Sequence, residues 1–152
     1  MKSVVMTILT AVTLFAYEKG DIISDDMAAH LGFSGDKVYI VDFFASWCGS
    51  CKKEIPLISK VNGQFDPKKV EVIGIDVDTD VEKGVKFQET LKAENNLNFR
   101  VINDPQHLII AEFNPLGMPT LYYVKDKKIV GVITGAVPDI DEQILRDLEG
   151  ME

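Results

Sequence analysis

The fold is decided by KVYIVDFFASWCGSCKKEIP, which occupies residues 37–56. Its first part, residues 37–45, is a run of β-branched and aromatic residues with the length of a buried strand. A helix is predicted from about Cys48 to Phe65, because apolar residues recur there at three- and four-residue intervals. This apolar face consists of Ile55, Ile58, Val61 and Phe65. Pro56 is expected to kink the helix.

Two cysteines lie where this strand passes into the helix. Cys48 and Cys51 fall within one helical turn, so they can close a disulfide with little movement of the backbone. The positive end of the helix dipole favours a thiolate, which is the attacking species in disulfide exchange. We therefore expect Cys48, at the helix tip, to be the exposed nucleophile and Cys51 to resolve the mixed disulfide.

The rest of the chain alternates between strand and helix patterns. Strands are predicted at residues 70–77, 99–102, 120–124 and 129–134, and helices at 25–31, 81–95, 105–113 and 140–148. The helix at 81–95 should bury Val81, Val85 and Leu91, and the last helix should bury Ile140, Ile144, Leu145 and Leu148. The last two strands must be antiparallel because their link is too short for a crossover. One α/β domain with a mixed sheet and helices on both faces is predicted.

Composition limits the possible functions. The chain has 152 residues and a formal net charge of -8, with 46% hydrophobic residues. An acidic chain of this kind argues against nucleic acid or anionic lipid as a partner. Two cysteines are too few for a disulfide framework, and they are only half of a zinc site. His30 and His107 are isolated in the sequence and are interpreted as core or surface residues, so no metal site is predicted.

The N-terminus has the pattern of a targeting segment. Lys2 provides a positive start, and Val4 to Ala16 carry no charge. This length suits the apolar region of a signal peptide and is too short for a membrane span of roughly 20 residues. Residues 1–16 are therefore predicted to be a signal peptide or an uncleaved anchor, and residues 17–152 the folded domain. A buried first strand is the alternative.

The segment DFFASWCGSCK, residues 42–52, resembles the active-site segment of the thioredoxin superfamily. Pro56 matches the kinking proline of that family, and Gly117-Met118-Pro119-Thr120 resembles its cis-proline loop. The resemblance implies a thioredoxin-like domain in which Met118 and Pro119 pack beside the cysteine pair. Such a loop would present backbone groups to a substrate segment, and Trp47 would add a contact surface.

Within this superfamily, residues 51–56 resemble the CxxCxxExP pattern of exported, membrane-side reductases of the TlpA, ResA and cytochrome c maturation types. Residues 103–105 and 117–120, with Ala111 and Phe113, resemble their downstream block. Residues 70–100 correspond to a strand–helix insertion that this subgroup carries. The resemblance covers roughly residues 37–148.

Two departures concern the chemistry. Gly49-Ser50 stands where the family usually has a proline before the second cysteine, which should shift the reduction potential. Asp42 matches a buried aspartate of thioredoxins, and Glu54 matches an acid of the subgroup, so this chain has both. Because Asp42 lies in an apolar strand, its pKa should be raised, and it could exchange a proton with Cys51. The predicted catalytic residues are Cys48, Cys51, Asp42 and Glu54; the predicted substrate-binding residues are Trp47, Met118 and Pro119.

The resemblance implies a periplasmic or otherwise exported reductase of protein disulfides. Its clients would be disulfide-containing proteins, including the haem-attachment cysteines of apocytochrome c, and a transmembrane reductase would supply electrons because the compartment is oxidising. A monomer is expected, and no cofactor is needed because the cysteine sulfurs carry the electrons.

Other functions fit the same residues. A disulfide-donating oxidant would use the same pair at a higher potential. A Cu(I) chaperone would use the two thiolates as ligands. If residues 1–16 are not a signal, the chain would be a cytosolic thioredoxin.

Overall fold

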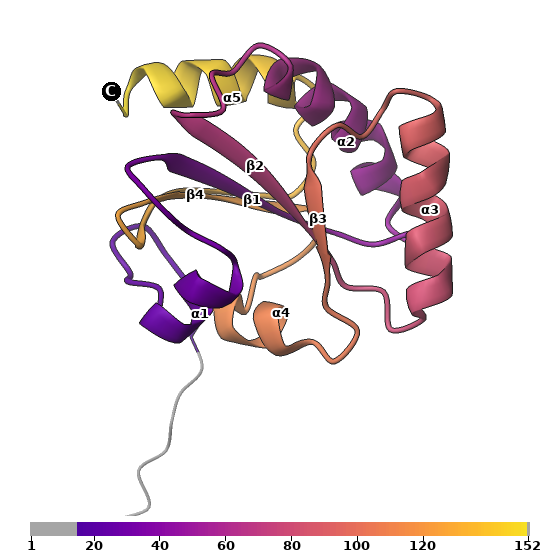
Figure 1. Ribbon diagram of the computed structural model, residues 1–152, viewed down its shortest axis with the longest axis horizontal. Helices are drawn as coiled ribbons and strands as arrows, with labels where there is room; N and C mark the ends of the chain where they lie inside the picture. The colour runs from indigo at the N-terminus through magenta and orange to yellow at the C-terminus, as the bar shows by residue number, and fades with distance from the viewer. Residues whose placement is uncertain (1–14, 152) are drawn as a thin grey trace, which may run out of the picture.

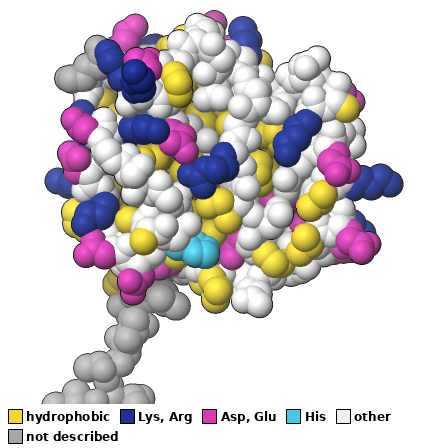
Figure 2. Space-filling view, viewed as in Figure 1, with side chains coloured by type: hydrophobic (Ala, Val, Ile, Leu, Met, Phe, Trp, Pro, Cys, Tyr) yellow, Lys and Arg dark blue, Asp and Glu magenta, His cyan; other side chains and the backbone are white. Residues whose placement is uncertain are grey.

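The computed structural model describes residues 15–151. The predicted signal peptide or anchor therefore lies outside the described residues, apart from its last two positions. Within the described part of the chain, none of the helices is long and apolar enough to cross a membrane. Acidic and basic side chains are interspersed over the face shown in Figure 2, rather than gathered by sign.

A five-stranded mixed sheet forms the centre of the molecule, in the order β3-β2-β1-β4-β5 (Figure 1). Its strands are β1 Val38–Phe44, β2 Val70–Asp76, β3 Arg100–Asn103, β4 Thr120–Lys125 and β5 Lys128–Thr134. β1, β2 and β3 are parallel, and β4 is antiparallel to both β1 and β5. The predicted mixed sheet and its antiparallel last pair are confirmed.

Within residues 15–151, five helices cover the two faces of this sheet, as can be followed in Figure 1. They are α1 Asp25–His30, α2 Gly49–Asn62, α3 Val81–Ala93, α4 Leu108–Phe113 and α5 Ile140–Glu149. α1 and α4 pack on one face, and α2, α3 and α5 on the other. Helices on both faces were predicted, and α2 continues through Pro56.

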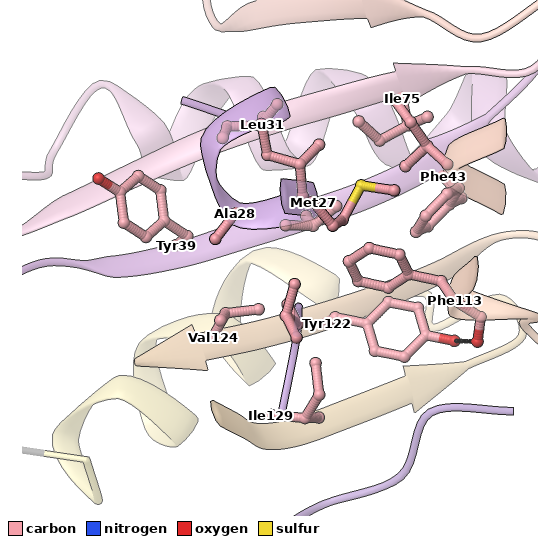
Figure 3. Packing of buried hydrophobic residues seen from close by; sticks show 14 of the residues in the cluster. Met27, Ala28, Leu31, Tyr39, Phe43, Ile75, Phe113, Tyr122, Val124 and Ile129 are labelled. Atoms are coloured by element: carbon pink, nitrogen blue, oxygen red, sulfur yellow. Dashed lines mark hydrogen bonds between the residues drawn. The ribbon is translucent and has the colours of Figure 1, made fainter. Parts of the chain in front are cut away.

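The hydrophobic layer beneath α1 and α4 is rich in aromatic rings (Figure 3). The ring centroids of Phe43 and Phe113 are 5.2 Å apart, and those of Phe113 and Tyr122 are 5.0 Å apart. The Tyr122 hydroxyl donates a hydrogen bond of 3.4 Å to the Phe113 carbonyl oxygen. The first pair is tilted and the second is edge-to-face, and aromatic packing of this kind adds to the stabilisation from burial.

The layer beneath α2, α3 and α5 contains the two cysteines. Because side chains alternate along a strand, β1 directs Tyr39, Val41 and Phe43 to the α1–α4 layer. Ile40 and Phe44 enter the α2–α3–α5 layer, and Asp42 lies between them on the same face. The strand thus places a carboxyl group in an apolar layer.

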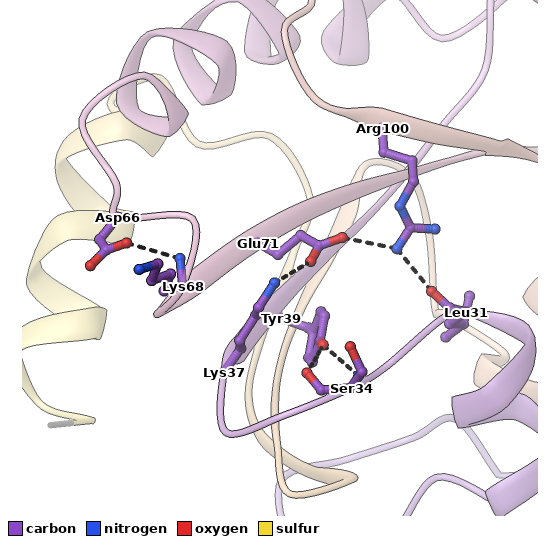
Figure 4. A network of polar contacts seen from close by, with 8 residues as sticks. All are labelled: Leu31, Ser34, Lys37, Tyr39, Asp66, Lys68, Glu71 and Arg100. Carbon is purple, nitrogen blue, oxygen red and sulfur yellow. Dashed lines mark hydrogen bonds and ion pairs between the residues drawn. The ribbon is translucent and has the colours of Figure 1, made fainter.

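Charged residues join the N-terminal ends of the three parallel strands (Figure 4). Glu71 on β2 accepts hydrogen bonds of 3.0 Å from both Lys37 and Arg100. Arg100 also donates to the Leu31 carbonyl oxygen at 2.9 Å, which connects β3 to the end of α1. Burial alone would raise the pKa of Glu71, but these two cations lower it.

Three predictions about the helices are wrong in detail. Leu91 is buried as predicted, but Val81 is 42% exposed and Val85 is only partly buried, because α3 also packs through Gly84 and Gln88. α4 begins at Leu108 rather than Pro105, since the Asp104 carboxylate accepts hydrogen bonds from the Leu108 and Ile110 backbone N–H groups and residues 105–107 form a turn. In α5, Leu145 faces solvent while Ile140 and Ile144 are buried.

Candidate active site

Cys48 and Cys51 form a disulfide at the N-terminus of α2. Their Cα atoms are 5.3 Å apart and the S–S bond is 2.08 Å long. Cys48 is the N-cap of the helix, where its Sγ accepts a 3.2 Å hydrogen bond from the Cys51 N–H. Cys48 is 7% exposed, which is less than expected for the nucleophile, although more than the 1% of Cys51. The arrangement can stabilise a thiolate on Cys48 with a backbone donor and the helix dipole.

Trp47 precedes the cysteine pair and is 67% exposed. Gly49, which lies between the two cysteines, is also exposed. Large exposed aromatic rings are frequent at protein interfaces, since they combine an apolar body with a polar edge. The geometry is compatible with the predicted contact surface, which stays a prediction.

The loop before β4 brings residues from far along the chain to the same place. The Met118–Pro119 peptide bond is cis. Met118 packs against the hydrophobic layer that contains Cys48 and Cys51, and also against the layer under α1 and α4. The Thr120 hydroxyl donates to the Gly117 carbonyl oxygen at 2.7 Å, and the Pro119 carbonyl oxygen accepts from the Gly135 N–H at 2.9 Å. These contacts fix the loop to β4 and the end of β5.

Asp42 is buried beneath this site, with 2% of its surface exposed. Its Oδ1 has no hydrogen-bond partner among the described residues. Burial, together with the negative charge of Glu54, raises the pKa of Asp42 well above its usual range. Asp42 can therefore hold a proton under conditions where an ordinary aspartate has lost it.

Glu54 lies on α2, one turn after Cys51, and is also buried. Its Oε1 accepts a 2.6 Å hydrogen bond from the Val137 N–H. Burial raises the pKa of Glu54, although the bond from Val137 acts in the opposite direction. A groove of about 380 Å³ borders this carboxylate, lined by Ser50, Lys53, Glu54, Leu57, Ala136, Val137 and Pro138. Glu54 thus connects the buried layer to solvent.

A polar network beside the cysteine loop was not predicted from the sequence. The Ser46 N–H and hydroxyl donate to the two carboxylate oxygens of Asp78, at 2.7 and 2.8 Å. The Asp78 N–H donates to Asp76 Oδ1 at 2.9 Å, and Gln88 donates to Asp76 Oδ2 at 2.7 Å. The sequence did contain a signal for this network, because Ser46 and Asp78 each follow a buried strand, and the ends of neighbouring parallel strands lie side by side.

His30 is the last residue of α1, and His107 immediately precedes α4. His30 is exposed, and the His107 ring nitrogen Nε2 lies 2.9 Å from the Val77 carbonyl oxygen. Within residues 15–151, no three residues among His, Cys, Asp and Glu come together in a way that could hold a metal ion.

The sequence of this chain is similar to those of known proteins. The profile of the AhpC/TSA family matches residues 14–133. Thiol-disulfide oxidoreductase ResA of Bacillus thuringiensis is 30% identical over 104 residues, which are 68% of this chain and 57% of ResA. Thioredoxin-2 of Saccharomyces cerevisiae is 31% identical over 112 residues, which are 74% of this chain and 81% of that protein. The chain spans less than two thirds of the length of ResA.

A solved structure shares the fold over nearly its full length. A candidate thiol:disulfide interchange protein DsbE from Chlorobium tepidum aligns with a TM-score of 0.71 at 23% identity, covering 89% of this chain and 98% of that one. The fold is therefore that of thioredoxin, as the sequence resemblance implied.

Proposed function

We propose that this chain, which belongs to the AhpC/TSA family, is a thiol–disulfide oxidoreductase of the thioredoxin type that reduces protein disulfides outside the cytoplasm. The observation that carries this proposal is the Cys48–Cys51 disulfide at the N-terminus of α2, packed in one layer with Met118. The names of the ResA relatives support the same class of reaction.

The reaction follows from the positions of the two sulfurs. In the reduced protein, the Cys48 thiolate attacks one sulfur of a client disulfide, and the client's other sulfur leaves as a thiolate. The Cys51 thiolate then attacks the Cys48 sulfur of this mixed disulfide and releases the second client sulfur. Two electrons and two protons pass to the client, and the protein is left with its Cys48–Cys51 disulfide.

Cys51 must lose a proton before it can attack, although it is almost fully buried. Asp42 and Glu54 are buried carboxyls with raised pKa values, and Asp42 lies on the face of β1 that enters the layer containing Cys51. Either carboxylate could accept this proton, and Glu54 borders the groove through which it would reach solvent. These roles explain why two carboxyls remain in an apolar layer where they cost stability.

The proposal also includes export from the cytoplasm and a flow of electrons from this protein to its clients. The uncharged run Val4 to Ala16 supports passage through or attachment to a membrane. Outside the cytoplasm, the disulfide must be reduced again by a membrane-borne dithiol, for which a transmembrane reductase is the class of partner. Clients would be proteins with accessible disulfides, including an apocytochrome c before haem attachment.

The equilibrium reduction potential of the Cys48–Cys51 pair tests the direction. In a dithiothreitol or glutathione buffer, we expect a value near or below roughly -250 mV, on the thioredoxin side of the known range. A value near about -120 mV would replace the reductase with a disulfide-donating oxidant. Cys48→Ser and Cys51→Ser serve as controls, since neither variant can close the disulfide.

Fractionation of cells that express the full chain tests export. We expect the protein outside the cytoplasm, and a variant that begins at residue 17 inside it. Recovery of the full chain from the cytoplasm would favour a cytosolic thioredoxin instead.

A further inference from the structure

We propose that Asp78 is a positioning residue for the cysteine pair, because it fixes the turn that delivers Cys48 to the N-terminus of α2. This inference rests on the proposed function, in which Cys48 is the attacking sulfur. Asp78 follows the end of β2, and its side chain is buried.

Both carboxylate oxygens of Asp78 bind the same residue of the turn. Oδ2 accepts from the Ser46 N–H at 2.7 Å, and Oδ1 accepts from the Ser46 hydroxyl at 2.8 Å. Two short bonds to one residue restrain its orientation as well as its position. Ser46 lies between the buried Ala45 and the exposed Trp47, where the chain leaves the core.

The turn held in this way ends at Cys48. The Cys48 N–H donates to the Ala45 carbonyl oxygen at 3.1 Å, which closes the turn around Ser46. The Cys48 Sγ then accepts from the Cys51 N–H at 3.2 Å. A turn that loosens at Ser46 would let Sγ move away from this donor, and the thiolate would lose stabilisation.

The position of Asp78 is itself restrained by a chain of hydrogen bonds. Its N–H donates to Asp76 Oδ1 at 2.9 Å, and Gln88 of α3 donates from Nε2 to Asp76 Oδ2 and to Asn103 Oδ1, each at 2.7 Å. The restraint on Ser46 therefore extends to the ends of β2 and β3 and to α3. A surface carboxylate with the same two bonds would be free to move with the loop.

Positioning and simple electrostatics predict opposite effects on Cys48. Removal of a nearby negative charge would by itself favour the thiolate and lower the pKa of the Cys48 thiol. Loss of positioning would raise this pKa. Asp78→Ala removes the charge and both contacts, whereas Asp78→Asn removes the charge but can still accept from the Ser46 N–H and donate to its hydroxyl.

The matched control is Asp104→Ala. Asp104 is a buried carboxylate that accepts from two backbone N–H groups, those of Leu108 and Ile110, at 2.8 and 2.9 Å. Its side chain fixes the turn before α4, and the 2.7 Å bond from its backbone N–H to the Asp76 carbonyl oxygen is kept in the alanine variant, so the substitution should cost comparable stability without loosening the cysteine loop. Urea unfolding of each variant measures that cost.

The readout is the pH dependence of iodoacetamide alkylation in the reduced full-length protein, which reports Cys48 because Cys48 is 7% exposed and Cys51 only 1%. We expect a thiolate fraction at neutral pH that is about three- to tenfold smaller in Asp78→Ala, and within about twofold of wild type in Asp78→Asn and Asp104→Ala. Ser46→Ala, which loses one of the two bonds, should shift in the same direction by less, and it serves if Asp78→Ala does not fold.

Equal behaviour of Asp78→Ala and Asp104→Ala would overturn the inference. A larger thiolate fraction in both Asp78 variants would also overturn it, since it would show a charge effect alone. An oxidising potential would refute the proposed direction of electron flow and leave this result standing, so the two failures can be told apart.

Discussion

Asp42 and Glu54 are buried carboxyl groups in an otherwise apolar layer of the core. Asp42 could be recognised in the sequence because it interrupts a run of strand-forming residues. The closeness of Glu54 to it could not, because the sequence does not tell which side of α2 faces β1. The contact between Ser46 and Asp78 was missed for a related reason, because the two residues follow different strands and lie far apart in the sequence.

Asp42→Asn is expected to stabilise the folded protein at mildly alkaline pH, by on the order of 1–3 kcal/mol. Burial, aided by Glu54, raises the pKa of Asp42, so the folded state keeps this proton to higher pH than the unfolded chain. The folded protein has its full stability at pH values below the pKa that Asp42 has in the unfolded chain, and it loses stability as pH rises towards the pKa that Asp42 has in the folded state. The stability gained by Asp42→Asn should therefore vanish in acid. Urea unfolding across this range measures it.

The control for this prediction is Asp141→Asn. The hydrogen bond with Lys60 lowers the pKa of Asp141, so that its contribution has the opposite sign and is lost as pH falls. This variant should lose stability at neutral pH. If Asp42→Asn behaved in the same way, Asp42 would be an ionised and well-paired group.

Glu54→Gln is expected to slow the resolution of mixed disulfides by about 10²-fold at neutral pH. Glutamine can still accept the Val137 hydrogen bond, but it cannot take a proton from Cys51. In the wild type, the rate should rise as pH rises through the raised pKa of Glu54, and this step should be absent in the variant. Fluorescence of Trp47, the single tryptophan in the sequence, follows the reaction in stopped flow.

Lys53→Gln provides a matched control, because Lys53 lines the same groove without offering a base. It should react at nearly the wild-type rate. A Glu54→Gln variant as fast as this control would leave Asp42 as the proton acceptor.

At the scale of elements, Gly84→Ala is expected to destabilise the protein by about 1–3 kcal/mol. Alanine usually stabilises the middle of a helix by about 1 kcal/mol relative to glycine. Here, an added Cβ would lie 2.7 Å from Asp76 Oδ2, inside the network that α3 covers. Thermal unfolding measures the change, and Glu89→Ala on the exposed side of α3 should have little effect.

The same helix shows how far the sequence could predict the elements. Its position and length were predicted, because apolar residues recur with helical spacing. Its buried face was predicted only at Leu91, because α3 also packs on the sheet through Gly84 and Gln88, and neither of these residues carries a hydrophobic signal. The start of α4 was missed for a related reason: Pro105 often opens a helix, but the Asp104 carboxylate delays it to Leu108.

At the scale of the whole molecule, the disulfide is linked to global stability. A reductase has a low potential because its folded state favours the disulfide over the dithiol. By the same thermodynamic cycle, the oxidised protein should be more stable to unfolding than the reduced protein, by about 1–3 kcal/mol, where 1.4 kcal/mol corresponds to about 30 mV. Parallel urea titrations of the two forms measure the difference, with Cys48→Ser as a reference that redox buffer should not affect.

A reduced form more stable than the oxidised one would contradict the proposed direction. That result is typical of a protein that donates its disulfide, because such proteins gain stability on being reduced. The comparison needs no client and no electron donor, so it remains informative while both are unidentified.

Met118 has a further consequence, which concerns chemical damage. Among the described residues, it alone packs against both hydrophobic layers, and it is only partly buried. Peroxide converts a thioether to a polar, chiral sulfoxide, which apolar surroundings accommodate poorly. Oxidation of this one side chain would therefore disturb both faces of the sheet beside the cysteine pair, and activity lost in this way would return only after enzymatic repair of the sulfoxide.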